Sequence, residues 1–263
     1  MSSESYGKYI SEVYDTLNSD IDYEKWADFT EECFKKYCTL GVKHINEIAC
    51  GTGSMSVLLA KRGYNLTCSD LSVEMLSLAD KKARDFNLSN IVFTNQDMRC
   101  FSDSVKAQAV LCMLDSINCL KTPKEVKACI SCANRVLEMG GIFLFDINSK
   151  YKFENVYADN AYVLEDEGIL CAWQNFYNEN SKLCDFYLSF FIEQADGSYK
   201  RHDEELREKM YTEKCVKKYL SECGFDICGV FSDYDFSPAD ENKHERLYFA
   251  AVKKQDISEN EYI

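Results

Sequence analysis

The chain has 263 residues, of which 46% are hydrophobic and 13% aromatic. That is enough apolar material for one main folded core, and it excludes a disordered or low-complexity chain. The 44 acidic and 30 basic residues leave a net charge of −14, which disfavours nucleic acids and anionic membranes as partners. No run of 18 apolar residues occurs and the first twenty residues have no apolar core, so we predict a protein that is neither secreted nor membrane-spanning.

The fourteen cysteines resemble small buried hydrophobes rather than a disulfide framework. Five of them lie inside apolar, strand-like runs: Cys50, Cys68, Cys112, Cys171 and Cys184. The only CxxC motif, Cys129 to Cys132, lies in an amphipathic helical pattern and has no second pair of ligands at a suitable spacing. We therefore predict reduced thiols, a cytoplasmic location and no metal site.

The first 150 residues show alternating helical and strand patterns. Residues 1–40 read as helices whose apolar and aromatic stripe includes Tyr14, Trp26 and Phe29. The predicted strands are 44–50, 65–70, 91–97, 109–114 and 141–148, and the predicted helices between them are 54–62, 72–86 and 123–138. This alternation predicts a doubly wound α/β fold, with a mostly parallel sheet covered on both faces.

The pattern changes after residue 148. Alternating apolar residues predict antiparallel strands at 169–177, 183–194 and 199–211, and a helix at 212–223 and strands at 226–234 and 245–253 then return to the first sheet. We expect a seven-stranded sheet whose last strand is antiparallel, with an antiparallel β insertion after strand five. The expected domains are 1–148 with 211–254 as the Rossmann-like unit, 149–210 as a substrate lid, and 255–263 as a tail.

The strongest motif follows the first strand and reads Glu47-Ile-Ala-Cys-Gly-Thr-Gly-Ser54. Gly51 and Gly53 allow a tight turn and a close approach of the backbone to a ligand at the sheet edge. A dinucleotide fingerprint requires a third glycine where this chain has Ser56, which weakens an NAD-binding interpretation. A plain strand-to-helix turn is the alternative.

Acidic residues follow the next two strands. Asp70 can accept hydrogen bonds from both hydroxyls of a ribose, although a helix N-cap is an alternative role. Asp97 can accept from an adenine amino group, and Met98 can pack on the ring. These residues would meet at one edge of the sheet.

Together these motifs resemble those of the class I S-adenosylmethionine-dependent methyltransferases. The N-terminal Tyr14-Asp-Thr-Leu17 segment and Phe145-Asp-Ile-Asn148 are similar to small bacterial members of unassigned substrate. A more distant resemblance is to sugar-nucleotide N,N-dimethyltransferases, which also carry a β insertion after strand five.

The resemblance implies S-adenosylmethionine as cofactor and a role for each matched residue. Ala49, Gly51 and Gly53 would line its methionine half, and Asp70 and Leu71 would contact its ribose. Asp97 and Met98 would contact its adenine, and Leu114 its inner face. Tyr14 and Trp26 would close over the sulfonium, and Glu47 and Met75 complete the predicted set.

The predicted activity is in-line methyl transfer to a small-molecule acceptor. The loop after strand four, Asp115-Ser-Ile-Asn118, has no proline, unlike the motif of enzymes that methylate DNA amino groups. The insertion should lie over the acceptor, and some of its aromatic residues should face it: Trp173, Phe176, Tyr177, Tyr187, Phe190 and Phe191. An NAD-dependent oxidoreductase and a non-catalytic S-adenosylmethionine-binding regulator are the alternatives; no catalytic residue is assigned, and both a monomer and a homodimer stay open.

Overall fold

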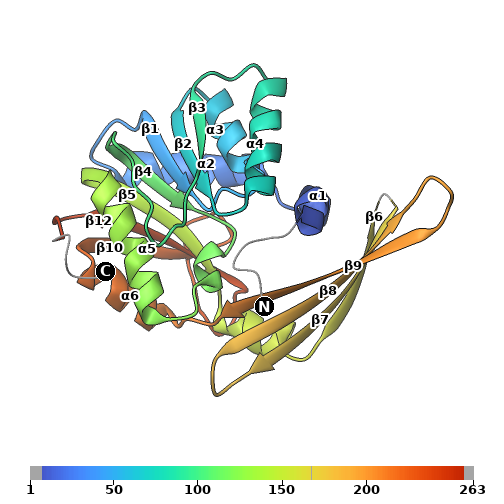
Figure 1. Cartoon of the computed structure of the whole chain (residues 1–263). Coiled ribbons are helices and arrows are strands. Elements are labelled where there is room, and N and C mark those ends of the chain that lie inside the picture. The colour runs from blue at the N-terminus through green and yellow to red at the C-terminus, as the bar shows by residue number, and fades with distance from the viewer. Residues whose placement is uncertain (1–7, 167, 258–263) are drawn as a thin grey trace.

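A computed structural model describes residues 8–166 and 168–257, and its strands form two separate sheets (Figure 1). The first seven residues of the predicted helical segment and residues 258–263 of the predicted tail lie outside this description. Within the described ranges, no helix is both long enough and apolar enough to cross a membrane.

The larger sheet has the strand order β11-β10-β12-β5-β4-β1-β2-β3. Its strands are β1 (His44–Ile48), β2 (Asn65–Asp70), β3 (Ile91–Asn95), β4 (Ala107–Cys112), β5 (Leu137–Asn148), β10 (Phe225–Ser232), β11 (Ser237–Pro238) and β12 (Arg246–Lys253). Neighbours among β1 to β5 pair in parallel, and β12 is antiparallel to both β5 and β10. The predicted doubly wound sheet is confirmed, and the two-residue β11 adds an eighth strand to the seven expected.

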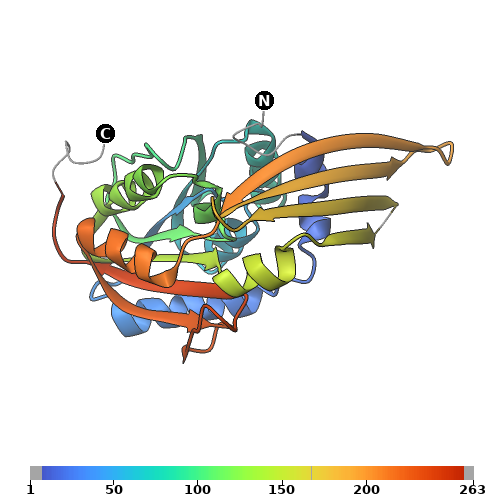
Figure 2. The same cartoon turned by 90° about the horizontal axis from the view of Figure 1, so that it is seen from below.

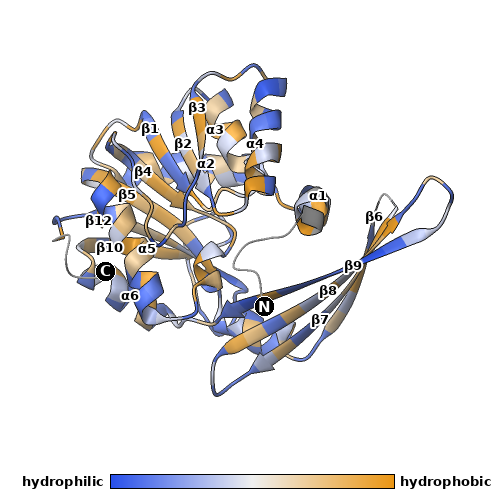
Figure 3. Cartoon of the chain, viewed as in Figure 1, coloured by the Kyte–Doolittle hydropathy of each residue, from blue (hydrophilic) through white to orange (hydrophobic). Residues whose placement is uncertain are grey.

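Helices cover both faces of this sheet: α2 (Tyr23–Tyr37), α3 (Ser54–Lys61), α4 (Val73–Asp85), α5 (Pro123–Val136) and α6 (Glu213–Glu222). Because side chains of a strand alternate between faces, Phe143 and Phe145 of β5 pack with α5 and α6, whereas Ile142 and Leu144 pack with α2 and α3. Figure 3 shows the strands as mainly hydrophobic and the outer side of α4 as hydrophilic. The sheet is therefore buried on both faces, as parallel sheets generally are.

The second sheet is antiparallel and follows β5 in the chain. After the short helix η2 (Lys152–Tyr157) it comprises β6 (Ala161–Asp166), β7 (Ile169–Asn178), β8 (Leu183–Glu193) and β9 (Tyr199–Lys209), in sequential order. Figure 2 shows it projecting away from the larger sheet. Three of these strands were predicted; the edge strand β6 was missed because residues 161–165 are exposed and their sequence shows no apolar–polar alternation.

Helix α1 (Lys8–Leu17) lies between the two sheets (Figure 1). Ile10 and Val13 pack into the apolar cluster of the second sheet, and the backbone N–H of Ile10 donates to Glu204 Oε1 of β9 at 2.9 Å. On its other side, Asp15 Oδ1 accepts from the Thr52 hydroxyl at 2.6 Å, and Asp15 Oδ2 lies 2.6 Å from Lys82 Nζ of α4. The helix therefore connects the loop after β1 to the inserted sheet.

Candidate functional site

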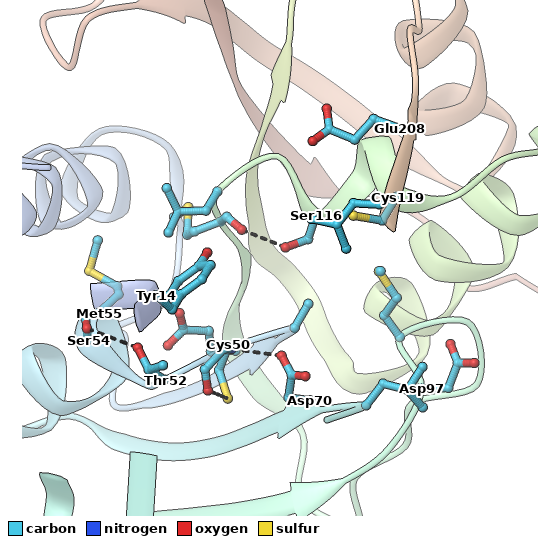
Figure 4. A pocket seen from close by; sticks show the side chains of 18 of the residues that line it. Tyr14, Cys50, Thr52, Ser54, Met55, Asp70, Asp97, Ser116, Cys119 and Glu208 are labelled. Atoms are coloured by element: carbon cyan, nitrogen blue, oxygen red, sulfur yellow. Dashed lines mark hydrogen bonds between the residues drawn. The ribbon is translucent and has the colours of Figure 1, made fainter. Parts of the chain in front are cut away.

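A pocket opens where the loops after β1 to β4 meet α1 and β9 (Figure 4). Nine of the twelve predicted site residues line it: Tyr14, Glu47, Ala49, Gly51, Asp70, Leu71, Asp97, Met98 and Leu114. They meet because parallel strands all end at the same sheet edge, where doubly wound folds bind ligands.

The loop after β1 has the left-handed backbone that its glycines permit. Ala49, Gly51 and Gly53 have φ values of 55°, 55° and 73°, and the Cys50 N–H donates to Ser69 of β2 at 2.9 Å. A Cβ added at Gly51 would meet nothing closer than Tyr14 Cε1, at 3.9 Å. The backbone at Gly51 is therefore open to a ligand beneath the Tyr14 ring.

Asp70, at the end of β2, is held by the backbone. Its Oδ2 accepts from the Gly51 N–H at 2.8 Å and its Oδ1 from the Ser72 N–H at 2.9 Å. Burial raises the pKa of this carboxyl, although these hydrogen bonds oppose the shift. Since the side chain that caps α4 belongs to Ser72, which accepts from Met75 N, Asp70 is not the N-cap. A carboxylate has about four acceptor positions, so Asp70 can accept further hydrogen bonds from a ribose diol.

Glu47 lies at the bottom of the pocket and is only 3% exposed. The Ser56 hydroxyl donates to its Oε2. Burial, together with the charge of Asp70, raises the pKa of Glu47 to about 7. Ser56 therefore has a polar role at the position where a dinucleotide fingerprint has its third glycine.

Asp97 forms an ion pair next to the position predicted for adenine. Arg99 Nε approaches its two oxygens at 3.0 and 2.9 Å, and the Arg99 backbone N–H donates to Oδ1 at 2.8 Å. Burial acts to raise the pKa of Asp97, but the hydrogen bonds and charge of Arg99 outweigh it and lower the pKa. An adenine amino group at this point would therefore share Asp97 with Arg99.

Three predicted site residues lie outside the pocket lining. Trp26 is 1% exposed and packs against Tyr234 and Tyr248 in the core, with ring centroids 5.4 and 5.8 Å away. Met75 is buried in α4. A Cβ at Gly53 would lie 2.8 Å from the Ala79 Cβ, so this glycine allows α3 and α4 to pack closely. Trp26 was predicted to close over the sulfonium, but its side of α2 faces the sheet and its side chain does not line the pocket; its neighbour Tyr23 does.

The insertion contributes residues that sequence analysis did not assign. Leu206, Arg207 and Glu208 of β9 line the pocket, whereas none of the six aromatic residues expected there does so. Glu208 is 9% exposed, and its Oε2 accepts from Asn148 Nδ2 at 3.0 Å. The alternation along β9 was a usable signal, because an inward-facing Leu206 places Glu208 on the same face.

Comparisons with known proteins agree with this geometry. A profile of methyltransferase domains matches residues 45–141. A protein of Geobacillus sp. (strain WCH70) that carries the name methyltransferase is 33% identical over 241 residues, which cover 91% of this chain and 96% of the relative.

Solved structures give the same result. An S-adenosylmethionine-dependent methyltransferase from Clostridium acetobutylicum is 30% identical, with a TM-score of 0.85 over 94% of this chain and 98% of its own. The sugar N-methyltransferase KedS8 from Streptoalloteichus shares the fold, with a TM-score of 0.74 at 18% identity over 97% of this chain and 98% of its own. The chain therefore belongs to the S-adenosylmethionine-dependent methyltransferases, and its cofactor is S-adenosylmethionine.

Proposed function

We propose that this enzyme transfers a methyl group, by in-line displacement, to a small-molecule acceptor bound between the glycine loop and the inserted sheet. The observation that carries this proposal is the single pocket that reaches from Gly51 and Asp70 to Glu208 of β9, with Tyr14 of α1 beside it. A pocket closed on several sides suits a small molecule better than a duplex, and the charge of −14 also disfavours nucleic acid. The division into a Rossmann-like unit and an acceptor lid at 149–210 is part of this proposal.

The residues of the pocket fit the cofactor. Asp70 offers two oxygens for the ribose hydroxyls, and the open face of Gly51 leaves room for a chain against the backbone. Met98 and Leu114 supply apolar surface for the adenine ring, and the Tyr14 ring can face a cation. When bound, S-adenosylmethionine supplies an electrophilic methyl group on a positively charged sulfur. The contribution of the protein is to align the acceptor with that methyl group and to exclude water.

Two further observations support parts of this proposal. The name of the structural neighbour KedS8 states a sugar N-methyltransferase activity, which favours a polar acceptor of modest size. The Ser56 to Glu47 contact, in place of a third glycine, disfavours NAD as a ligand.

We also propose a cytoplasmic location, since all fourteen cysteines are free and nine of them are buried.

The Asp70→Ala variant tests the cofactor site. We expect it to weaken the binding of S-adenosylmethionine and of its demethylated product by about 10- to 100-fold, because hydrogen bonds to a charged acceptor contribute about 1.5–3 kcal/mol. Isothermal titration calorimetry measures both affinities.

Asp85→Ala is the matched control, since Asp85 is an exposed carboxylate at the far end of α4, and it should leave both affinities unchanged. Equal affinity of the wild type and Asp70→Ala would remove Asp70 from the site, and tight binding of NAD by the wild type would contradict the proposed function.

A further inference from the structure

Glu208 is a buried carboxylate in the pocket that has no part in the cofactor cradle. It belongs to β9, and Figure 4 shows it away from Asp70 and Asp97, on the side of Ser116 and Cys119. Asn148 Nδ2 holds one of its oxygens at 3.0 Å and also donates to the Tyr157 hydroxyl at 3.1 Å. The backbone N–H of Asn148 donates to Asn118 Oδ1 at 2.9 Å, which holds the backbone from which this side chain projects.

The cationic groups around Glu208 contact other side chains. Arg246 of β12 binds two other carboxylates, Asp115 Oδ1 at 2.7 Å and Asp146 Oδ2. Lys152 of η2 lies over the Tyr157 ring, 5.2 Å from its centroid. Among the described residues, no cationic nitrogen lies within 4.0 Å of the Glu208 carboxylate. Glu208, whose carboxyl group opens into the pocket, therefore has no cationic group at ion-pair distance among the described residues, and a ligand with a positive charge would stabilise its ionised form.

We propose that Glu208 binds the methyl acceptor as an ammonium ion and removes its proton, so that the acceptor is an amine. This inference rests on the proposed function, because it concerns the acceptor side of the same pocket. A buried carboxylate without a partner cation favours a ligand that brings the missing positive charge. A neutral hydroxyl acceptor brings no positive charge to stabilise the ionised form of Glu208, and a carboxylate acceptor would disfavour that form.

The step balances in atoms and charge. One N–H bond of the ammonium breaks, its proton forms an O–H bond with Glu208, and the electron pair stays on nitrogen. That pair then forms the N–C bond to the methyl group, while the electrons of the S–C bond remain on sulfur. The methylated nitrogen is again an ammonium, and the Glu208 proton leaves to solvent before the next cycle.

The environment of Glu208 suits a base that works near neutral pH. Burial, followed by the charge of Asp115, raises its pKa to about 8, against the opposing effects of Asn148, Lys152 and Arg246. The titratable and charged groups that face it are Asp115 and Cys119 from the segment after β4, Lys152 and Tyr157 of η2, Cys184 of β8 and Arg246 of β12.

A pair of cofactor analogues tests this inference without knowledge of the acceptor. Sinefungin carries an ammonium group in place of the methyl-bearing sulfonium, whereas S-adenosylhomocysteine is neutral at that position. We expect Glu208→Gln to weaken sinefungin binding by about 10-fold or more and to change S-adenosylhomocysteine binding by less than about 2-fold, as measured by calorimetry at a pH of about 8.5. Glu205→Gln is the matched control, because Glu205 lies on the exposed face of the same strand and should leave both affinities unchanged.

The wild type provides a second measurement if Glu208→Gln does not fold. Its preference for sinefungin over S-adenosylhomocysteine should fall as the pH is lowered from about 8.5 to about 6, because Glu208 becomes protonated. Glu47 does not affect this ratio, because both analogues carry the same amino acid end. A preference that is independent of pH, or unchanged in Glu208→Gln, would overturn the role of Glu208. Failure of the wild type to bind either analogue would instead overturn the proposed function itself.

Discussion

Four carboxylates line one pocket, and each has a different partner. Glu47 accepts from the Ser56 hydroxyl, Asp70 from backbone N–H groups, Asp97 from Arg99, and Glu208 from the amide of Asn148. The pKa is lowered only for Asp97, which has a guanidinium beside it, and burial raises it for the other three. The same functional group, a carboxyl, is therefore a fixed anion at Asp97 and a group that can accept a proton at Glu47 and Glu208.

Glu47 should make the stability of the ligand-free protein depend on pH. Its pKa rises from an ordinary 4.5 to about 7 on folding, so between these values the folded state binds more protons than the unfolded state. The contribution of Glu47 to the free energy of unfolding is present in full below pH 4.5 and is lost as the pH rises to about 7. This is a change of about 3 kcal/mol. Glu47→Gln, which cannot ionise, should therefore gain stability relative to the wild type over this range, as measured by urea unfolding at pH values from about 5 to about 8.

The exposed Glu32 gives the control, because its replacement by glutamine alters no buried carboxyl group and should not produce the gain in stability expected for Glu47→Gln. A stability difference between Glu47→Gln and the wild type that is the same at every pH would contradict the raised pKa of Glu47.

At the scale of secondary structure, α1 connects the two sheets. It contacts the glycine loop and α4 through Asp15, and the inserted sheet through Ile10 and Val13. We expected the larger sheet to supply the cofactor site and the insertion to supply only the acceptor pocket. The contacts of α1 link these two roles, because the helix that carries Tyr14 rests on the insertion.

Asp15→Ala should loosen this connection. It removes the hydrogen bond from Thr52 and the ion pair with Lys82. Since Asp15 is 48% exposed, we expect the free energy that holds α1 against the larger sheet to fall by only about 1 kcal/mol. The affinity for S-adenosylmethionine, measured by calorimetry, should fall about 3- to 10-fold. The midpoint of urea unfolding of the larger sheet should stay close to that of the wild type.

Asp20→Ala is the control, since Asp20 is an exposed acid just after α1, and it should bind as the wild type does. Wild-type affinity in Asp15→Ala would show that packing on the insertion alone holds α1 in place.

At the scale of the whole molecule, the cysteines are distributed through all three apolar clusters. Cys112 and Cys129 lie on one face of the larger sheet, Cys50 and Cys68 on the other, and Cys171 in the inserted sheet. Only Cys100 and Cys215 are exposed. Thiols in these positions fill the core as small apolar groups do.

Thiol titration should therefore distinguish the native from the unfolded chain. In denaturant, without reductant and protected from air, we expect fourteen reactive thiols, whereas in the native protein Cys100 and Cys215 should react first and the nine buried thiols last. Burial raises the pKa of Cys171 to about 11 and that of Cys184 to about 12, which slows their reaction further. A count of about ten or fewer in denaturant would indicate disulfides or bound metal.

The sequence by itself determined the larger sheet and one half of the site. The alternation of strand and helix patterns predicts a parallel sheet, and a parallel sheet brings its strand ends together, so the sequence alone assigns Gly51, Asp70 and Asp97 to one pocket. These residues follow their strands directly, and their positions depend on local sequence and on topology alone.

Only the tertiary structure decided the other half, which depends on how separate elements face each other. Trp26 and Tyr23 both belong to the aromatic stripe of α2, and only packing against Tyr248 shows that Trp26 points into the core while Tyr23 reaches the pocket. Glu208 is one of several acids on β9, and its proximity to Asn148 depends on how the inserted sheet folds back over β5. The cofactor side was therefore readable from the sequence because it is built from consecutive strand ends. The acceptor side was not, because it is built from contacts between residues far apart in the chain.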